Sequence, residues 1–161
     1  MNDILNKIKF FFLKPKVVII VGQRRKKTEE MILRVLGQCF KIGQDIFIFE
    51  TEENDINKLS FYIKHSKMPI LVEDEKIKAA NETLKFGFDE KNDVFASDIK
   101  LNGGINFKVN YNGSFVPFWT ASFADMSLEN NKKQIYPILA VVCVGTVFGL
   151  NLVEISQSLK Q

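Results

Sequence analysis

The strongest constraint on the fold is an apolar stretch, residues 15–22, that ends on a glycine and leads directly into a helical pattern. Within it, Val17–Val21 is continuously apolar, as in a strand that is covered on both faces of a sheet. The helix that follows is expected over about Thr28–Phe40, where apolar side chains recur every three or four residues. A buried strand, a loop with a glycine and a helix form the layout in which backbone N–H groups at a helix start hold phosphate.

The loop itself departs from that layout in its residue types. A phosphate loop needs glycine where the backbone approaches the phosphate, then lysine and Ser/Thr for the phosphates and Mg²⁺. Here Arg24 or Arg25, depending on the register, stands at the second glycine position, where a side chain prevents the close approach. The bases of Arg24–Lys27 are either a solvated helix start or an anion contact, and an arginine could fill the phosphate volume itself. The candidates for residual phosphate contacts are Gly22, Lys26, Lys27 and Thr28.

The remaining periodicity predicts an α/β fold, a P-loop-like three-layer domain. Buried strands at Ile46–Phe49 and Met68–Val72, separated by a helix, predict a short parallel sheet flanked by helices. An antiparallel β subdomain of four further apolar stretches follows, and Asn-Gly turns separate the last three of them. The four stretches are Thr83–Phe88, Val94–Leu101, Ile105–Tyr111 and Ser114–Trp119. Helices are expected over about Asn131–Phe148 and Leu152–Leu159. We therefore expect one unit, 1–161, made of segments 1–14, 15–82, 83–121 and 131–160.

Composition excludes several functional classes. The net charge of +3 is slight and does not indicate a nucleic-acid partner. Cys39 and Cys143 have no metal-ligand spacing, so we expect buried free thiols in a reducing cytoplasm. His65, the only histidine, is interpreted as a surface or capping residue rather than a catalytic base.

Two segments raise the question of a membrane. Met1–Leu13 is interpreted as an amphipathic helix that packs on the domain, with peripheral membrane contact as the alternative. Gln134–Val153 carries no charge over 20 residues and is long enough to cross a bilayer. Pro137 and Gly145 within it, and the charged amphipathic tail after it, favour a helix buried in a core. We expect no membrane span.

Several weak motifs occur in a consistent order along nearly the whole chain. They are Lys14–Gly22, Thr28–Ile32, Ile46–Glu50, Asp55–Leu59 with Pro69, Leu84–Phe88 with Asp93–Ile99, and Lys132–Ile155. This order resembles the central, ATP-binding domain of the Mur ligases, above all the branch that adds D-alanyl-D-alanine to UDP-muramoyl tripeptide. The resemblance implies a shortened version of that domain, with ATP and Mg²⁺ as cofactors. It also implies that Glu50, at the end of the second strand, is a magnesium ligand.

The departures from the family pattern concern the parts that carry its chemistry. The family has a stretch after the third strand with a histidine and a carbamylated lysine, whereas here Val72 continues directly into Glu73–Lys76. The nucleotide-contacting helix start, G-x-H-N-x-x-N in the family, reads Asn131–Pro137 here. Neither the UDP-sugar domain nor the third domain is recognisable in this sequence. Acyl-phosphate chemistry needs positioned phosphates, metal and two aligned substrates, so we assign no catalytic residue.

These observations predict a degenerate Mur ligase-like domain, a pseudoenzyme that acts as a binding or interaction module with a protein partner or a second copy. The alternative is an ATP-binding component of a peptidoglycan-precursor amide ligase that a partner chain completes. A membrane-associated protein is the third hypothesis. We expect a cytoplasmic location.

Overall fold

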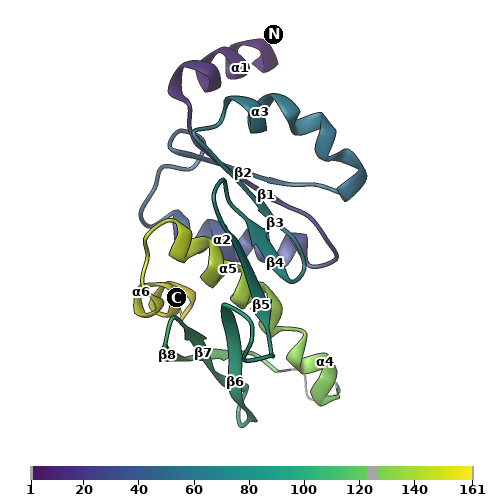
Figure 1. Cartoon of the computed structure of the whole chain (residues 1–161), viewed down its shortest axis with the longest axis vertical. Coiled ribbons are helices and arrows are strands. Elements are labelled where there is room, and N and C mark those ends of the chain that lie inside the picture. The colour runs from purple at the N-terminus through teal and green to yellow at the C-terminus, as the bar shows by residue number, and fades with distance from the viewer. Residues whose placement is uncertain (1, 123–126, 161) are drawn as a thin grey trace.

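The computed structural model describes residues 2–122 and 127–160, and within them eight strands form one sheet in the order β2-β1-β3-β4-β5-β6-β7-β8 (Figure 1). The elements of the first half are α1 (Asn2–Leu13), β1 (Lys16–Ile20), α2 (Arg25–Leu36), β2 (Ile46–Glu50), the 3₁₀ helix η1 (Glu53–Leu59), α3 (Ser60–His65) and β3 (Met68–Val72). Those of the second half are β4 (Lys76–Lys78), β5 (Thr83–Gly87), β6 (Val94–Leu101), β7 (Ile105–Tyr111), β8 (Ser114–Thr120), α4 (Leu128–Lys132), α5 (Ile135–Val147) and α6 (Leu152–Lys160).

The parallel half confirms the predicted three-layer arrangement. β1 lies between β2 and β3, and both pairings are parallel. Successive side chains of a strand point to opposite faces, so Val18 and Ile20 join the core shared with α2 and α5. Val17 and Ile19 pack on the other face, with Phe10 of α1 and the side chains of η1 and α3.

The second half is antiparallel from β6 to β8, as the Asn-Gly turns predict. One expectation is wrong: β5 and β6 do not form an antiparallel hairpin but pair in parallel, with Phe86 opposite Val94. The reason is a compact loop in which Asn92 N donates to Asp89 O and Asp93 accepts from Lys85 N, at 3.0 and 2.8 Å. This loop returns the chain to the end of β5 instead of folding it back along the strand. The short strand β4 was not predicted.

The apolar C-terminal segment is a core helix. The predicted helix over Asn131–Phe148 is divided into α4 and α5, because Pro137 has no N–H and is best tolerated in a first helical turn. Every residue of α5 from Pro137 to Gly145 is buried, between α2, α6 and the sheet. Within the described residues, no helix is long and apolar enough to span a membrane.

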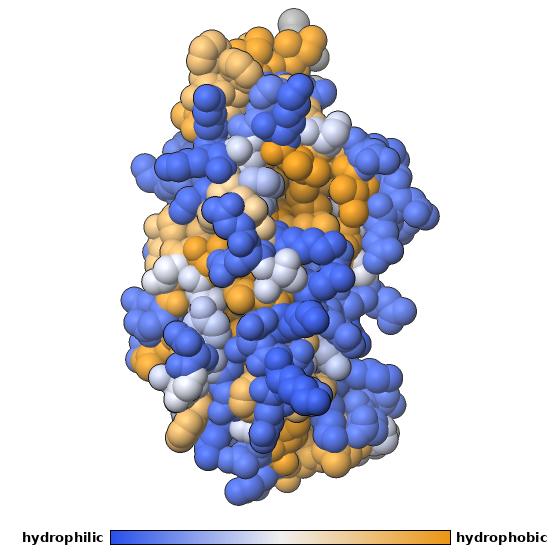
Figure 2. Space-filling view, viewed as in Figure 1, coloured by the Kyte–Doolittle hydropathy of each residue, from blue (hydrophilic) through white to orange (hydrophobic). Residues whose placement is uncertain are grey.

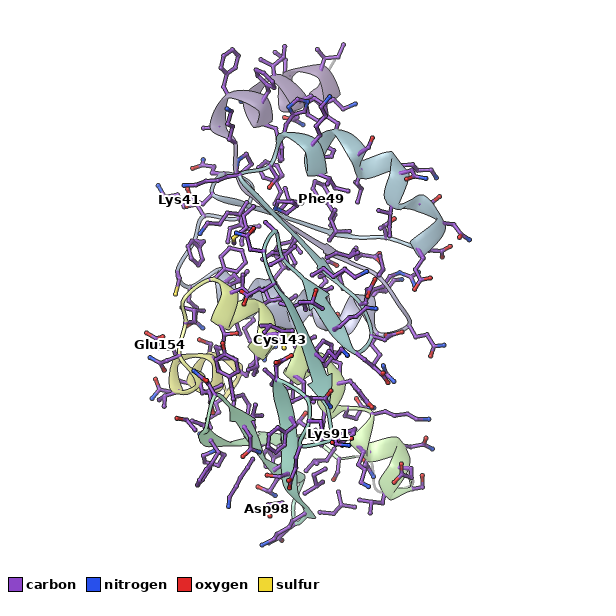
Figure 3. The ribbon with its side chains drawn as sticks, in the orientation of Figure 1. Lys41, Phe49, Lys91, Asp98, Cys143 and Glu154 are labelled. Atoms are coloured by element: carbon purple, nitrogen blue, oxygen red, sulfur yellow. The ribbon has the colours of Figure 1, made fainter. Side chains whose placement is uncertain are left out.

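The two cysteines differ in exposure. Cys143 is buried on α5, in the middle of the molecule (Figure 3). Cys39 is exposed, so the prediction of a buried thiol is wrong at this position. α2 ends at Leu36, and the following turn carries Cys39 away from the apolar face of the helix.

Helix α1 packs on the domain, as predicted, but through a narrow contact. Among its described side chains Phe10 alone is buried, at 0% exposed. Its ring meets those of Phe47 and Tyr62 with centroids 5.1 and 4.9 Å apart. The other apolar side chains of α1 face outward, which the expectation of a docked amphipathic helix did not include.

Candidate functional site

The ends of the three parallel strands bring residues from distant parts of the sequence to one edge of the sheet. Ile20 of β1 lies opposite Glu50 of β2 and opposite Val72 of β3. Gly22 lies two residues after the end of β1, and Asp74 lies two residues after the end of β3. The carboxyl edge of parallel strands is where α/β proteins bind their ligands, so this edge is the candidate site.

The carboxylate of Asp74 lies directly against Gly22. Gly22 has φ +94°, and a Cβ atom at this position would be 2.6 to 2.8 Å from the carboxylate atoms of Asp74. The backbone N of Gln23 is 3.5 Å from Asp74 Oδ2, and the Arg24 guanidinium is 3.4 Å from Asp74 Oδ1. An anion from the protein itself therefore lies beside the backbone at which a phosphate loop holds its phosphate.

Arg25 connects the opposite side of the loop to β2. Its Nε atom donates to Glu50 Oε2 at 2.7 Å, and its terminal nitrogens donate to Glu52 Oε1 and to Gly22 O, both at 3.2 Å. The side chains of Arg25 and Glu50 are 26% and 30% exposed, so the pair is largely withdrawn from solvent. Glu50, which the resemblance assigned to magnesium, is thus neutralised by a guanidinium.

Arg24 is held between Asp74 and an aromatic ring. Its guanidinium carbon lies 4.5 Å from the ring centroid of Tyr136 on α5, a distance at which a cation is attracted to a π face. Burial raises the pKa of the Tyr136 hydroxyl, and the negative charge of Glu75 adds to the effect. The positive charge of Arg24 opposes this rise in the pKa of Tyr136.

Acidic side chains surround Arg25. Burial raises the pKa of Glu29 above its ordinary value, and repulsion from Glu50 and Glu30 raises it further.

The structure brings together some of the residues that the sequence analysis selected and separates others. Gly22 and Glu50 both contact Arg25. Lys26 and Lys27 are exposed on the first turn of α2, where Lys27 Nζ is 3.9 Å from Glu30. Thr28 is 4% exposed and lies inside the fold. Within residues 2–122 and 127–160 no group of three or more His, Cys, Asp or Glu side chains could hold a metal ion. As placed here, Glu50 is paired with Arg25 rather than free to take a Mg²⁺ ion.

Sequence reasoning missed the partners of the two arginines, namely Asp74, Tyr136 and Glu52. One signal for Asp74 was present, since it comes shortly after the predicted strand Met68–Val72 and so at the same edge of the sheet as Gly22. Tyr136 had no comparable signal, because its helix meets the loop only through tertiary packing.

Solved structures resemble this arrangement over nearly the whole chain. MurF ligase from Thermotoga maritima in complex with ADP matches with a TM-score of 0.62 over 94% of this chain, at 14% sequence identity. One MurF structure from Acinetobacter baumannii matches with a TM-score of 0.61 over 98%, at 13% identity, and another with 0.58 over 98%, at 11%. The chain has a Mur ligase fold.

The likeness to MurF shows the fold alone, because the identities are low. The chain spans about half the length of these MurF structures, 48% to 50%. No family model and no curated protein sequence matches it. The ADP in one MurF structure belongs to that protein.

Proposed function

We propose that this chain is a Mur ligase-like domain whose phosphate loop no longer serves a nucleotide, and that it acts as a binding or interaction module. The observation that carries the proposal is the 2.7 Å ion pair between Arg25 and Glu50. In this proposal residues 1–161 form one unit, and its place in peptidoglycan-precursor assembly in the cytoplasm remains a prediction.

The charged groups at this edge of the sheet are already paired with one another. A Mg²⁺–nucleotide at this edge would need Glu50 free for the metal and the loop backbone free for phosphate. Arg25 is paired with the first of these groups, and Asp74 lies beside the second. Binding would have to break both interactions, and a partly buried carboxylate that loses its partner becomes costly. The arginines thus stabilise the loop in the form seen here.

A nucleotide titration tests this proposal directly. We expect no shift in Tm with millimolar ATP, with or without Mg²⁺, because a ligand that binds only the folded state would raise it. Arg25→Gly removes the cation and restores glycine, so a shift that appears only in this variant would show an intact scaffold with a blocked loop. Arg25→Lys is the matched control, since it keeps the charge. Mg²⁺-dependent ATP hydrolysis by the wild-type chain that Lys26→Ala or Lys27→Ala abolishes would refute the proposal.

The alternative, an ATP-binding component completed by a partner chain, is favoured by two observations. The similar MurF structures are about twice as long as this chain, and one of them contains ADP. Under this alternative the arginines would leave their carboxylates and contact the phosphates. A saturable Tm increase in the wild-type chain that Arg25→Gly weakens would support it over the first proposal.

A further inference from the structure

Helix α1 presents an apolar stripe to the outside of the molecule. Its exposed apolar side chains are Ile4 67%, Leu5 55%, Ile8 48%, Phe11 45%, Phe12 78% and Leu13 58%. At about 100° per residue, all of these except Leu13 fall within an arc of roughly 120°. Phe10 lies outside this arc and makes the buried contact with the domain. The stripe is therefore a surface in addition to the face that holds the helix in place.

Basic side chains accompany this stripe. Around the circumference of the helix, Lys7 lies at one border of the stripe and Lys9 at the other. A groove beside α1 is lined by Lys9, Lys14, Lys16 and Lys67, and Asp45 is the acidic side chain among its described lining residues. Lysines thus outnumber acidic side chains four to one in the lining of this groove.

The position of α1 suits contact with a flat surface. The helix forms one end of the elongated molecule and runs across its long axis (Figure 1). Figure 2 shows apolar surface over α1 at this end. The phosphate loop follows the opposite end of β1, so a surface bound by α1 would leave the loop accessible. The stripe is convex, and a convex apolar ridge enters a lipid layer without needing a complementary groove.

We propose that α1 is an interfacial anchor that lies on an anionic lipid bilayer. Its phenylalanine and isoleucine side chains would enter the acyl boundary, and its lysines would contact the anionic headgroups. The twelve residues of the helix extend about 18 Å, too short for the roughly 30 Å hydrocarbon core, so α1 lies on the membrane. A second copy of the chain is a poorer occupant, because a two-fold contact pairs identical patches and would bring lysines together.

Vesicle co-sedimentation of the full chain tests this inference. The vesicles are phosphatidylcholine alone, or an equal mixture of phosphatidylcholine and phosphatidylglycerol. We expect binding to the anionic mixture that weakens at high salt, because screening removes the attraction to the headgroups. Phe12→Ser is expected to reduce the partition coefficient at least about tenfold. Lys9→Gln is expected to reduce it about fivefold.

Phe115→Ser is the matched control, because Phe115 is 58% exposed on β8, in a different part of the fold. It should leave binding unchanged, and the Tm of each variant should stay near that of the wild type. Three results would overturn the inference. They are no binding to anionic vesicles, equal losses in Phe12→Ser and Phe115→Ser, or a dimer that Phe12→Ser converts to monomers while vesicle binding is unchanged. The last result would assign the stripe to a second copy. Because these readouts involve no nucleotide, they are independent of the proposed function.

Discussion

Replacing Arg25 with alanine tests whether the arginine-filled loop is an energetically coupled structure. The side chain donates to Glu50 at 2.7 Å and to Glu52 and Gly22 O at 3.2 Å. Charge-assisted hydrogen bonds contribute about 1.5–3 kcal/mol when buried, and exposed ion pairs about 0.2–1 kcal/mol. Since Arg25 and Glu50 are 26% and 30% exposed, we expect a loss of about 1.5 kcal/mol in the free energy of unfolding. For a domain of this size that lowers Tm by about 3–6 °C.

A double-mutant cycle isolates the pair from other effects of the substitution. Arg25→Ala, Glu50→Ala and the double variant are unfolded in urea and followed by far-ultraviolet circular dichroism. Glu50→Ala should cost less than Arg25→Ala, because removing Glu50 also relieves the repulsion that acts on Glu29. Alanine is a good helix former, so the first turn of α2 should persist in Arg25→Ala.

The control cycle uses Lys58 and Asp55, which form an ion pair at 2.9 Å with side chains 75% and 44% exposed. We expect a coupling energy of about 1 kcal/mol or more for Arg25–Glu50 and less than about 0.5 kcal/mol for the control. If the Arg25–Glu50 coupling also falls below about 0.5 kcal/mol, the arginine does not stabilise the loop, and our account of the site is refuted.

Two further predictions concern titratable groups. The pKa of Glu29 is raised in the folded state, so this state binds more protons, and the free energy of unfolding decreases as the pH rises through that interval. Glu29→Gln should therefore be more stable than the wild type at neutral pH, and this advantage should disappear below the ordinary pKa of 4.5. Urea unfolding at several pH values measures the difference. An advantage that does not change with pH would contradict this prediction. For the cysteines, burial raises the pKa of the Cys143 thiol, whereas Cys39 is exposed. A thiol reagent should label Cys39 in the native protein and Cys143 only after unfolding, and native labelling of Cys143, identified by peptide mass, would count against the buried position of α5.

The sequence was enough to predict the parallel strands, the hairpins from β6 to β8 and the presence of arginine where a phosphate loop has glycine. They depend on local chemistry: β-branched apolar runs form buried strands, Asn-Gly pairs form tight turns, and arginine cannot replace glycine close to a phosphate. The motif order also indicated the Mur ligase fold that the structural comparisons show. Residues 15–22 alone constrained the fold more than any other stretch.

The partners of the loop were decided by tertiary structure. Tertiary packing places Asp74 beside Gly22 and Glu50 beside Arg25, across separations of about 50 and 25 residues that no local pattern encodes. The same holds for the outward stripe of α1, because only the packed fold decides that Phe10 is the side chain that α1 buries. The parallel pairing of β5 with β6 and the exposure of Cys39 follow instead from a compact loop and from a helix end that the sequence pattern did not indicate. The sequence therefore reveals that arginines follow Gly22 in the loop between β1 and α2, and only the fold reveals that Arg25 pairs with the carboxylate the resemblance assigns to the metal.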